Sequence, residues 1–173
     1  MKKFFALVLA LVMVLSLVAC GGDKKDEAKV IKIGVFEPQT GDNGAGGKQE
    51  ILGMQYANHV QPTVEVNGET YNVELVIVDH RTHAEHGPSA GAELVDEDDS
   101  TVLGSYGSSV AIAASDTFAA AGIPAIGVTC TNPQVTEGND HYFRICFLDP
   151  FQGTVLANFA HDELGADTVY CLG

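Results

Sequence analysis

Glycines and serines concentrate in one short segment of the chain, Gly-Ser-Tyr-Gly-Ser-Ser at residues 104–109. This segment follows an apolar run of strand length and precedes an alanine-rich stretch that is predicted to be a helix. Free backbone N–H groups at the start of a helix carry a partial positive charge and neighbouring hydroxyls add donors, so the segment suits a carboxylate or another small anion. Ser108 and Ser109 are therefore candidate ligand-binding residues, and both could also cap the helix.

The same serines do not form a recognisable catalytic site. Residues 105–108 do not match the G-x-S-x-G elbow of hydrolases, and the spacing assigns no histidine to them. The glycine-rich residues 41–48 are not a phosphate loop, because Asp42 stands where the first glycine is required and Gln49 replaces the magnesium-binding hydroxyl. We expect no enzymatic activity and no cofactor. Residues 41–48 are instead interpreted as a flexible loop at the carboxyl end of a strand, where open α/β sheets bind ligands.

Three histidines, His80, His83 and His86, are spaced by three residues. In a helix they could converge on a metal ion. Gly87 and Pro88 follow at once, however, so a loop is favoured, with solvated histidines that titrate near an ordinary pKa of about 6.5. No metal site is predicted, and a histidine-based metal-binding protein is kept only as an alternative.

Residues 1–19 have the composition of a secretory signal peptide, with a basic start, an apolar run and small residues next to Cys20. The junction Leu-Val-Ala-Cys-Gly resembles the lipobox of bacterial lipoproteins. That resemblance implies that Cys20 is lipidated and that residues 20–29 form a flexible tether to a folded domain. The alternative is a short transmembrane helix, for which the length barely suffices because spanning needs about 20 apolar residues.

Acidic residues dominate the charge of the chain. There are 9 Lys and Arg against 23 Asp and Glu, for a formal net charge of −14. Phosphate backbones would repel such a protein, so nucleic acid is not an expected partner. Anionic headgroups would repel it as well, so the lipid on Cys20, and not surface charge, would hold it at a membrane.

The remaining cysteines, Cys130, Cys146 and Cys171, match no metal or redox spacing. Extracytoplasmic conditions would permit a disulfide, and Cys130 with Cys146 is the pair that could form one. Three buried thiols that behave as small apolar side chains are the favoured interpretation.

Apolar runs of strand length alternate with helix-like stretches from residue 30 onward, which predicts an α/β fold with a doubly wound, mostly parallel sheet. Asn67-Gly68 predicts a hairpin turn, since both residues tolerate positive φ. The chain ends inside an expected strand, so we expect it to be a fragment of a longer protein. Strands are expected at residues 30–36, 63–66, 71–79, 101–104, 123–128, 142–147 and 168–172, and helices at 49–58, 88–97, 108–121 and 151–164.

Several stretches together resemble the type I periplasmic substrate-binding proteins of ABC importers, in particular the leucine/isoleucine/valine-binding class. Their order and spacing carry the resemblance, which covers nearly all of residues 30–173. The matching stretches are residues 31–36 with Thr40-Gly41, residues 104–109, residues 122–126 running into 129–133, and residues 142–144 leading to 149–153.

The resemblance implies two α/β lobes that close on an amino acid-like ligand. By alignment, Ser108 and Thr131 fall where the family binds the ligand's α-carboxylate, and Thr129 falls where a main-chain carbonyl accepts from its ammonium group. The family's acidic partner for the ammonium would lie beyond Gly173. Gly46 stands where relatives that prefer aliphatic amino acids often have an aromatic wall, so an aliphatic ligand is not implied.

On the same resemblance, residues 30–150 are the N-terminal ligand-binding lobe and residues 151–173 begin a second lobe. The implied protein is an extracytoplasmic, lipid-anchored solute-binding protein that delivers a small amino acid-like ligand to an ABC permease. An extracytoplasmic sensor with the same fold is the alternative. Because two lobes would share the ligand, we expect this chain alone to bind it weakly.

Overall fold

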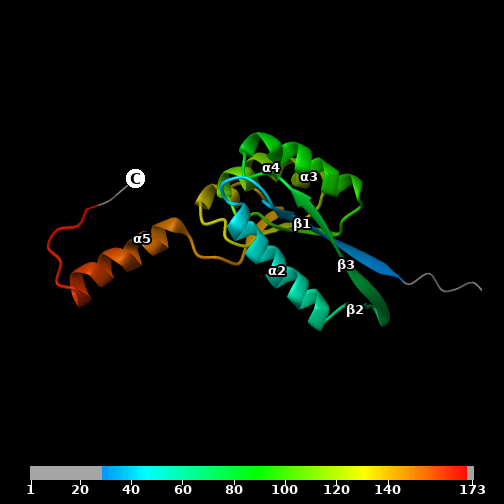
Figure 1. Cartoon of the computed structure of the whole chain (residues 1–173), viewed down its shortest axis with the longest axis horizontal. Helices are drawn as coiled ribbons and strands as arrows, with labels where there is room; N and C mark the ends of the chain where they lie inside the picture. The colour runs from blue at the N-terminus through cyan, green and yellow to red at the C-terminus, as the bar shows by residue number, and fades with distance from the viewer. Residues whose placement is uncertain (1–28, 171–173) are drawn as a thin grey trace, which may run out of the picture.

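The computed structural model describes residues 29–170, which form a single twisted sheet flanked by helices (Figure 1). The sheet has six strands in the order β2-β3-β1-β4-β5-β6. β2 pairs antiparallel with β3, and every other neighbouring pair is parallel. The strands are β1 (Val30–Glu37), β2 (Thr63–Val66), β3 (Glu69–Asp79), β4 (Thr101–Gly104), β5 (Ala125–Gly127) and β6 (Tyr142–Arg144).

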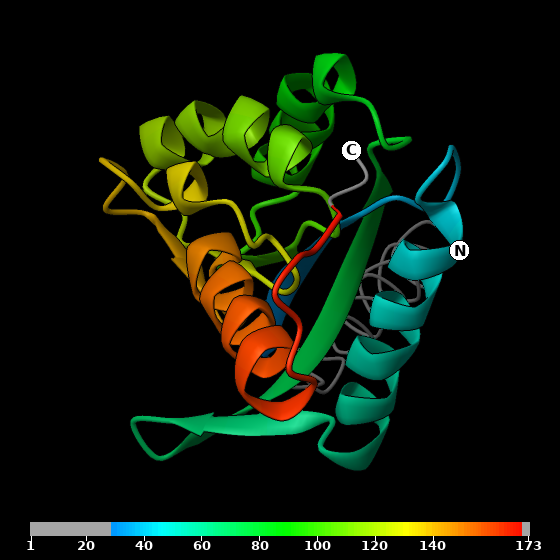
Figure 2. The same ribbon diagram turned by 90° about the vertical axis from the view of Figure 1, so that its left-hand side faces the viewer.

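Helices lie on both faces of this sheet, as the doubly wound fold class predicts (Figures 1 and 2). α2 (Gly44–Val60) covers one face, and α3 (Gly87–Asp96) and α4 (Ser108–Ala121) pack side by side on the other. α5 (Asp149–Asn158) follows β6 and continues into a π-helical turn, Phe159–Glu163. The predicted α/β class with a mostly parallel sheet is confirmed.

Local signals set two of the element boundaries. Asn67 and Gly68 join β2 to β3 with φ angles of 53° and 81°, so both adopt the positive φ that a tight hairpin requires. Gly122 ends α4 in the left-handed conformation with a φ of 70°. Both features agree with the sequence-based expectation.

The core lies between the sheet and the α3–α4 layer. Phe36 of β1 meets Phe118 of α4 edge to face, with ring centroids 5.5 Å apart and an interplanar angle of 88°. Leu94 and Val102 are buried in the same cluster. The α2 face is only partly covered, and a mostly apolar groove of about 580 Å³ remains between α2 and the strands.

Some expected boundaries differ from the structure. α2 begins at Gly44 and not at residue 49, because Gly47 lets the helix approach Pro38 so closely that a side chain would overlap it. The strands expected at 123–128 and 142–147 are limited to β5 and β6. Residues 168–170 form no strand, since they have no neighbouring strand among the described residues; residues 171 and 172 lie outside them.

The sequence alone predicts that the acidic run at residues 96–99 is a solvated helix end and loop, but one of these residues is buried. Asp99 is only 4% exposed and neither of its carboxyl oxygens has a hydrogen-bond partner in the described structure. Burial raises its pKa from 3.8 to about 6, with the charge of Lys32 acting in the opposite direction. A polar sequence pattern therefore concealed a buried carboxyl group.

The expectations for the leader at 1–19, for lipidation of Cys20, for most of the 20–29 tether and for Cys171 fall outside the described residues. Within residues 29–170, no helix combines the length and the apolar character needed to cross a membrane. α5 and the turn after it leave several large apolar side chains exposed, among them Phe151, Leu156 and Phe159.

Candidate functional site

Strand order points to one edge of the sheet as the site. β1 lies in the middle, its following parallel strand β3 lies on one side, and β4 lies on the other. The connections therefore run to one side of β1 first and to its other side afterwards, so the strand order reverses between β1 and β4. Doubly wound sheets bind ligands in the crevice beyond the carboxyl ends of the strands at such a point. Glu37 ends β1 there, and Gly104 ends β4.

The loop after β4 is held by buried polar groups from several elements. The Tyr106 N–H donates to Glu37 Oε2 at 2.8 Å. The Cys130 thiol donates to the Ser105 carbonyl at 2.7 Å, and the Tyr142 hydroxyl donates to the Gly104 carbonyl at 2.8 Å. These three side chains come from distant places in the sequence, so their hydrogen bonds hold the loop in place without a ligand.

His80 is a further anchor and not a solvated residue, so the expectation for it was wrong. The Thr82 N–H donates to its Nδ1 at 3.3 Å, which assigns the proton to Nε2. His80 Nε2 then donates to Ser105 Oγ at 2.8 Å. Burial lowers the pKa of His80 from 6.5 to about 4, so the ring is neutral at pH 7.

Because His80 is the donor in this pair, it cannot act as a base that activates Ser105. The Ser105 oxygen also accepts from the Gly107 N–H at 3.0 Å, and Ser105 is fully buried. The serine and histidine therefore support the loop and do not form a nucleophile and base pair.

Ser108 and Ser109 lie at the first turn of α4. Gly107 is the N-cap, and no side chain caps the helix, so the expected capping by these serines is not found. The first N–H groups of α4 thus remain available for an anion. Ser108 Oγ accepts from the Asn132 N–H at 3.3 Å, which leaves its own O–H free to donate.

That hydrogen bond brings the second predicted loop beside the first. Thr131 is partly exposed, next to Asn132, and its carbonyl accepts from the Asp149 N–H at 3.0 Å. Arg144 of β6 clamps the same loop: its guanidinium donates to the carbonyls of Cys130, Asn132 and Pro133 and to the Thr136 hydroxyl. Ser108, at the start of α4, and Thr131, on the loop after β5, therefore lie on adjoining segments.

Thr129 is exposed at the same edge. Its hydroxyl lies 2.7 Å from Glu50 Oε1 and 3.1 Å from the Tyr106 carbonyl, so its single proton is shared between two acceptors. Glu50 belongs to α2, so its contact with Thr129 links α2 to the loops that follow β4 and β5.

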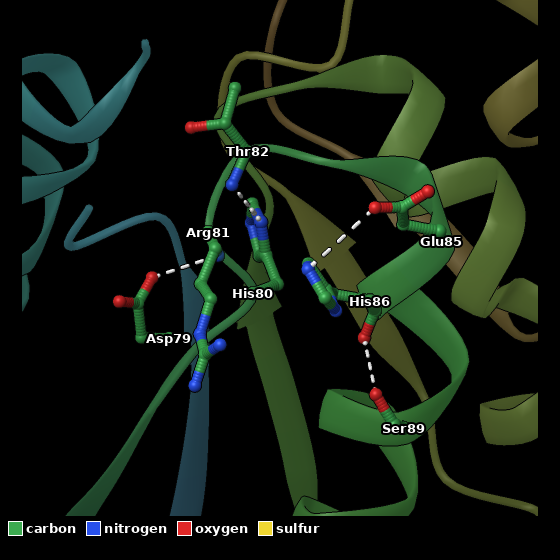
Figure 3. A network of polar contacts seen from close by, with 7 residues as sticks. All are labelled: Asp79, His80, Arg81, Thr82, Glu85, His86 and Ser89. Atoms are coloured by element: carbon green, nitrogen blue, oxygen red, sulfur yellow. Dashed lines mark hydrogen bonds and ion pairs between the residues drawn. The ribbon is translucent and has the colours of Figure 1, made fainter. Parts of the chain in front are cut away.

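The loop between β1 and α2, residues 38–43, is held to the end of β3 by hydrogen bonds. Burial tends to raise the pKa of Asp79, but hydrogen bonds from Thr40 and from the Arg81, Gln39 and Thr40 N–H groups hold it below its ordinary value. Thr82 Oγ1 donates to the Thr40 carbonyl at 3.0 Å. Figure 3 shows the Asp79–Arg81 and Thr82–His80 contacts at this corner.

Tyr106 occupies the space that Gly46 leaves open. A Cβ on Gly46 would overlap the Tyr106 ring, and the Gly46 Cβ position lies 2.5 Å from the Tyr106 Cζ atom. Tyr106, from the loop after β4, therefore covers the start of α2, although the segment around Gly46 has no aromatic residue of its own.

The three histidines do not converge. His80 is buried and contacts Ser105, whereas the His83 and His86 ring centroids lie 6.2 Å apart. Figure 3 shows His86 turned toward Glu85 and away from His80. Residues 29–170 contain no group of three His, Cys, Asp or Glu side chains placed to hold a metal ion. Cys130 and Cys146 are both free, and burial raises the pKa of the Cys130 thiol to about 12, so it stays protonated.

With this geometry in place, comparison with known proteins identifies the family. The family model described as "Periplasmic binding protein" matches residues 30–173. The chain belongs to this family.

Two similar proteins illustrate the relationship in sequence. An amino acid binding protein of Pseudomonas aeruginosa is 37% identical over 142 residues, which is 80% of this chain and 37% of that protein. A Leu/Ile/Val-binding protein homolog 1 of Brucella abortus is 33% identical over 135 residues, covering 77% of this chain and 36% of its own.

Solved structures of similar proteins have the same fold. The leucine binding protein LivK of Thermotoga maritima superposes with a TM-score of 0.72 at 36% identity, covering 79% of this chain and 38% of its own. The branched-chain amino acid transporter substrate binding protein LivJ of Streptococcus pneumoniae, in complex with isoleucine, gives 0.72 at 29% identity, covering 80% and 40%. This periplasmic binding protein chain thus spans about two fifths of the length of those relatives.

Proposed function

We propose that this chain is the N-terminal lobe of an amino acid-binding protein and that its loops bind the carboxylate of the ligand. Ser108 and Thr131 donate their hydroxyls, Ser109 adds a backbone N–H, and the Thr129 carbonyl accepts from the ammonium group. The observation that carries the proposal is the hydrogen bond between Ser108 and Asn132, which sets the two loops side by side. The names of the similar proteins point to amino acids, branched-chain ones among them.

The electrostatics of the edge support this assignment. The chain is strongly acidic, with a net charge of −14, so an anion cannot be attracted by overall charge. Uncapped N–H groups at the start of α4 supply a local positive potential that does not depend on Lys or Arg. The nearby Arg144 is occupied in holding the Thr131 loop.

The proposed protein acts outside the cytoplasm and is not an enzyme. The lipobox-like junction supports attachment to the membrane through lipidated Cys20. Residues 151–173 would start a second lobe, which is consistent with the exposed apolar side chains of α5. Closure of the two lobes around the amino acid would produce the form that an ABC permease recognises.

A titration of the ¹⁵N-labelled chain with leucine tests this proposal. If two lobes share the ligand, one lobe contributes about half of the binding free energy of a micromolar complex, which corresponds to a Kd of about 1 mM. We expect millimolar binding with shifts of the Ser109 and Thr131 amide resonances. No shift at up to about 50 mM leucine contradicts the assignment, and submicromolar affinity contradicts the sharing between lobes.

A further inference from the structure

Two carboxyl groups meet beneath the ligand edge. Glu37, at the end of β1, is 0% exposed, and Glu50, on α2, is partly exposed. Glu37 Oε2 accepts from the Tyr106 N–H, whereas Glu37 Oε1 and Glu50 Oε2 are buried without a conventional donor. The Glu37 side chain lies within hydrogen-bonding reach of Glu50, so one shared proton between the two carboxyl groups satisfies both oxygens.

This proton resides on Glu37. Burial, followed by the hydrogen bond and the charge of Glu50, raises the pKa of Glu37 to about 10. Glu37 is therefore the protonated member of the pair at pH 7, and its proton points to Glu50. A buried neutral acid that donates a hydrogen bond to its neighbour fixes the orientation of the second carboxyl group.

The other carboxyl oxygen of Glu50, Oε1, contacts the loops of the site. Glu50 Oε1 accepts from the Thr129 hydroxyl at 2.7 Å, and the Tyr106 carbonyl lies 3.1 Å from the same hydroxyl. Thr129 and Tyr106 are both exposed. Glu50 Oε1 and the Tyr106 carbonyl are therefore two acceptors at one end of the edge. Tyr106 precedes Ser108 by two residues and Thr129 precedes Thr131 by two, and the hydroxyls of Ser108 and Thr131 are the proposed donors.

We propose that Glu50 binds the ammonium group of the ligand and makes this lobe selective for amino acids over carboxylic acids with the same side chain. This inference rests on the proposed function. It adds an acidic group within the chain to the one that the family resemblance places beyond Gly173. The donors at α4 and the acceptors at Glu50 then match the two charges of a zwitterion.

The experiment compares leucine with 4-methylpentanoate, which has the same side chain and carboxylate but no amino group. Both are titrated into the ¹⁵N-labelled chain. The wild type is expected to bind leucine at least about tenfold more tightly, since a hydrogen bond to a charged group contributes about 1.5–3 kcal/mol. Equal affinities for the two ligands overturn the inference, whereas absence of binding by both overturns the proposed function itself.

The variant Glu50→Gln keeps the acceptor for Thr129 and removes the charge. We expect it to lose about tenfold in leucine affinity and to bind 4-methylpentanoate at least as well as the wild type. Glu93→Gln makes the same charge change at an exposed position of α3 and should leave both affinities unchanged. An unchanged ratio of the two affinities in Glu50→Gln overturns the inference.

A second variant covers the case in which Glu50→Gln does not fold. Glu50→Asp retains the charge but withdraws it by one methylene group, so the preference for leucine should fall by several fold. A purely structural role of Glu50 would change both affinities together and leave their ratio intact, and that result also overturns the inference.

Discussion

The buried His80 ring makes stability depend on pH in a way that a substitution can isolate. Its pKa falls from 6.5 to about 4 on folding, mainly through burial. The unfolded chain therefore binds a proton at this position before the folded chain does. The stabilisation by neutral His80 is fully present above pH 6.5 and is lost progressively as the pH falls toward 4.

The size of the effect follows from the shift. A change of one unit corresponds to about 1.4 kcal/mol, so the shift of His80 from 6.5 to about 4 amounts to about 3 kcal/mol of unfolding free energy. Glu37 and Asp99 act in the opposite direction, because their raised pKa values make the folded state more stable as the pH falls. The pH dependence of wild-type stability is therefore the sum of opposing contributions from His80, Glu37 and Asp99.

Urea unfolding of the wild type and of His80→Gln, at intervals from pH 7 to pH 4, separates them. Glutamine can still donate to Ser105 but does not titrate. We expect the free energy of unfolding of the wild type to fall by about 3 kcal/mol relative to the variant over this range. Two parallel profiles would refute a buried, neutral His80 that donates to Ser105.

Three further substitutions test other parts of the structure by urea unfolding. Asp99→Asn should raise the free energy of unfolding at pH 7 by about 1 kcal/mol. It should also remove the loss of stability that the wild type shows as the pH rises through about 6, where Asp99 ionises. Asp116→Asn, at an exposed position, should do neither. Gly46→Ala should destabilise the protein by about 1–3 kcal/mol, and it should be harmless in a Tyr106→Ala background, where the clash is gone; an equal cost in both backgrounds contradicts this contact. Gly53→Ala, in the middle of α2 with open space around it, should stabilise by about 1 kcal/mol, and a loss would mean that the position is crowded.

Local sequence signals were sufficient for much of the fold. Helix α4 was predicted with its observed bounds, because an alanine-rich body ends at Gly122, where only a left-handed residue fits easily. The Asn67-Gly68 hairpin was predicted for a similar reason. The start of α2 was missed, since the glycines that suggested a loop are needed there for close contact with Pro38.

The supporting residues of the site could not be predicted in the same way. Glu37 and Tyr106 are 69 residues apart in sequence, and His80 and Ser105 are 25 apart, so no spacing rule relates them. One signal was present: a polar residue at the end of a strand, such as Glu37, or directly after it, such as His80, marks the carboxyl edge of the sheet, where ligands bind. The ligand roles of Ser108 and Thr131 came from the family resemblance and remain predictions.

The central claim is that the Ser108 and Thr131 hydroxyls bind the carboxylate of an amino acid. The most direct measurement is the Kd of isoleucine for the wild type, for the double variant Ser108→Ala/Thr131→Val and for Ser115→Ala, which removes a hydroxyl from the middle of α4. We predict millimolar binding by the wild type and by Ser115→Ala, and a loss of more than about tenfold in the double variant. A double variant that folds and binds isoleucine as tightly as the wild type would contradict the account.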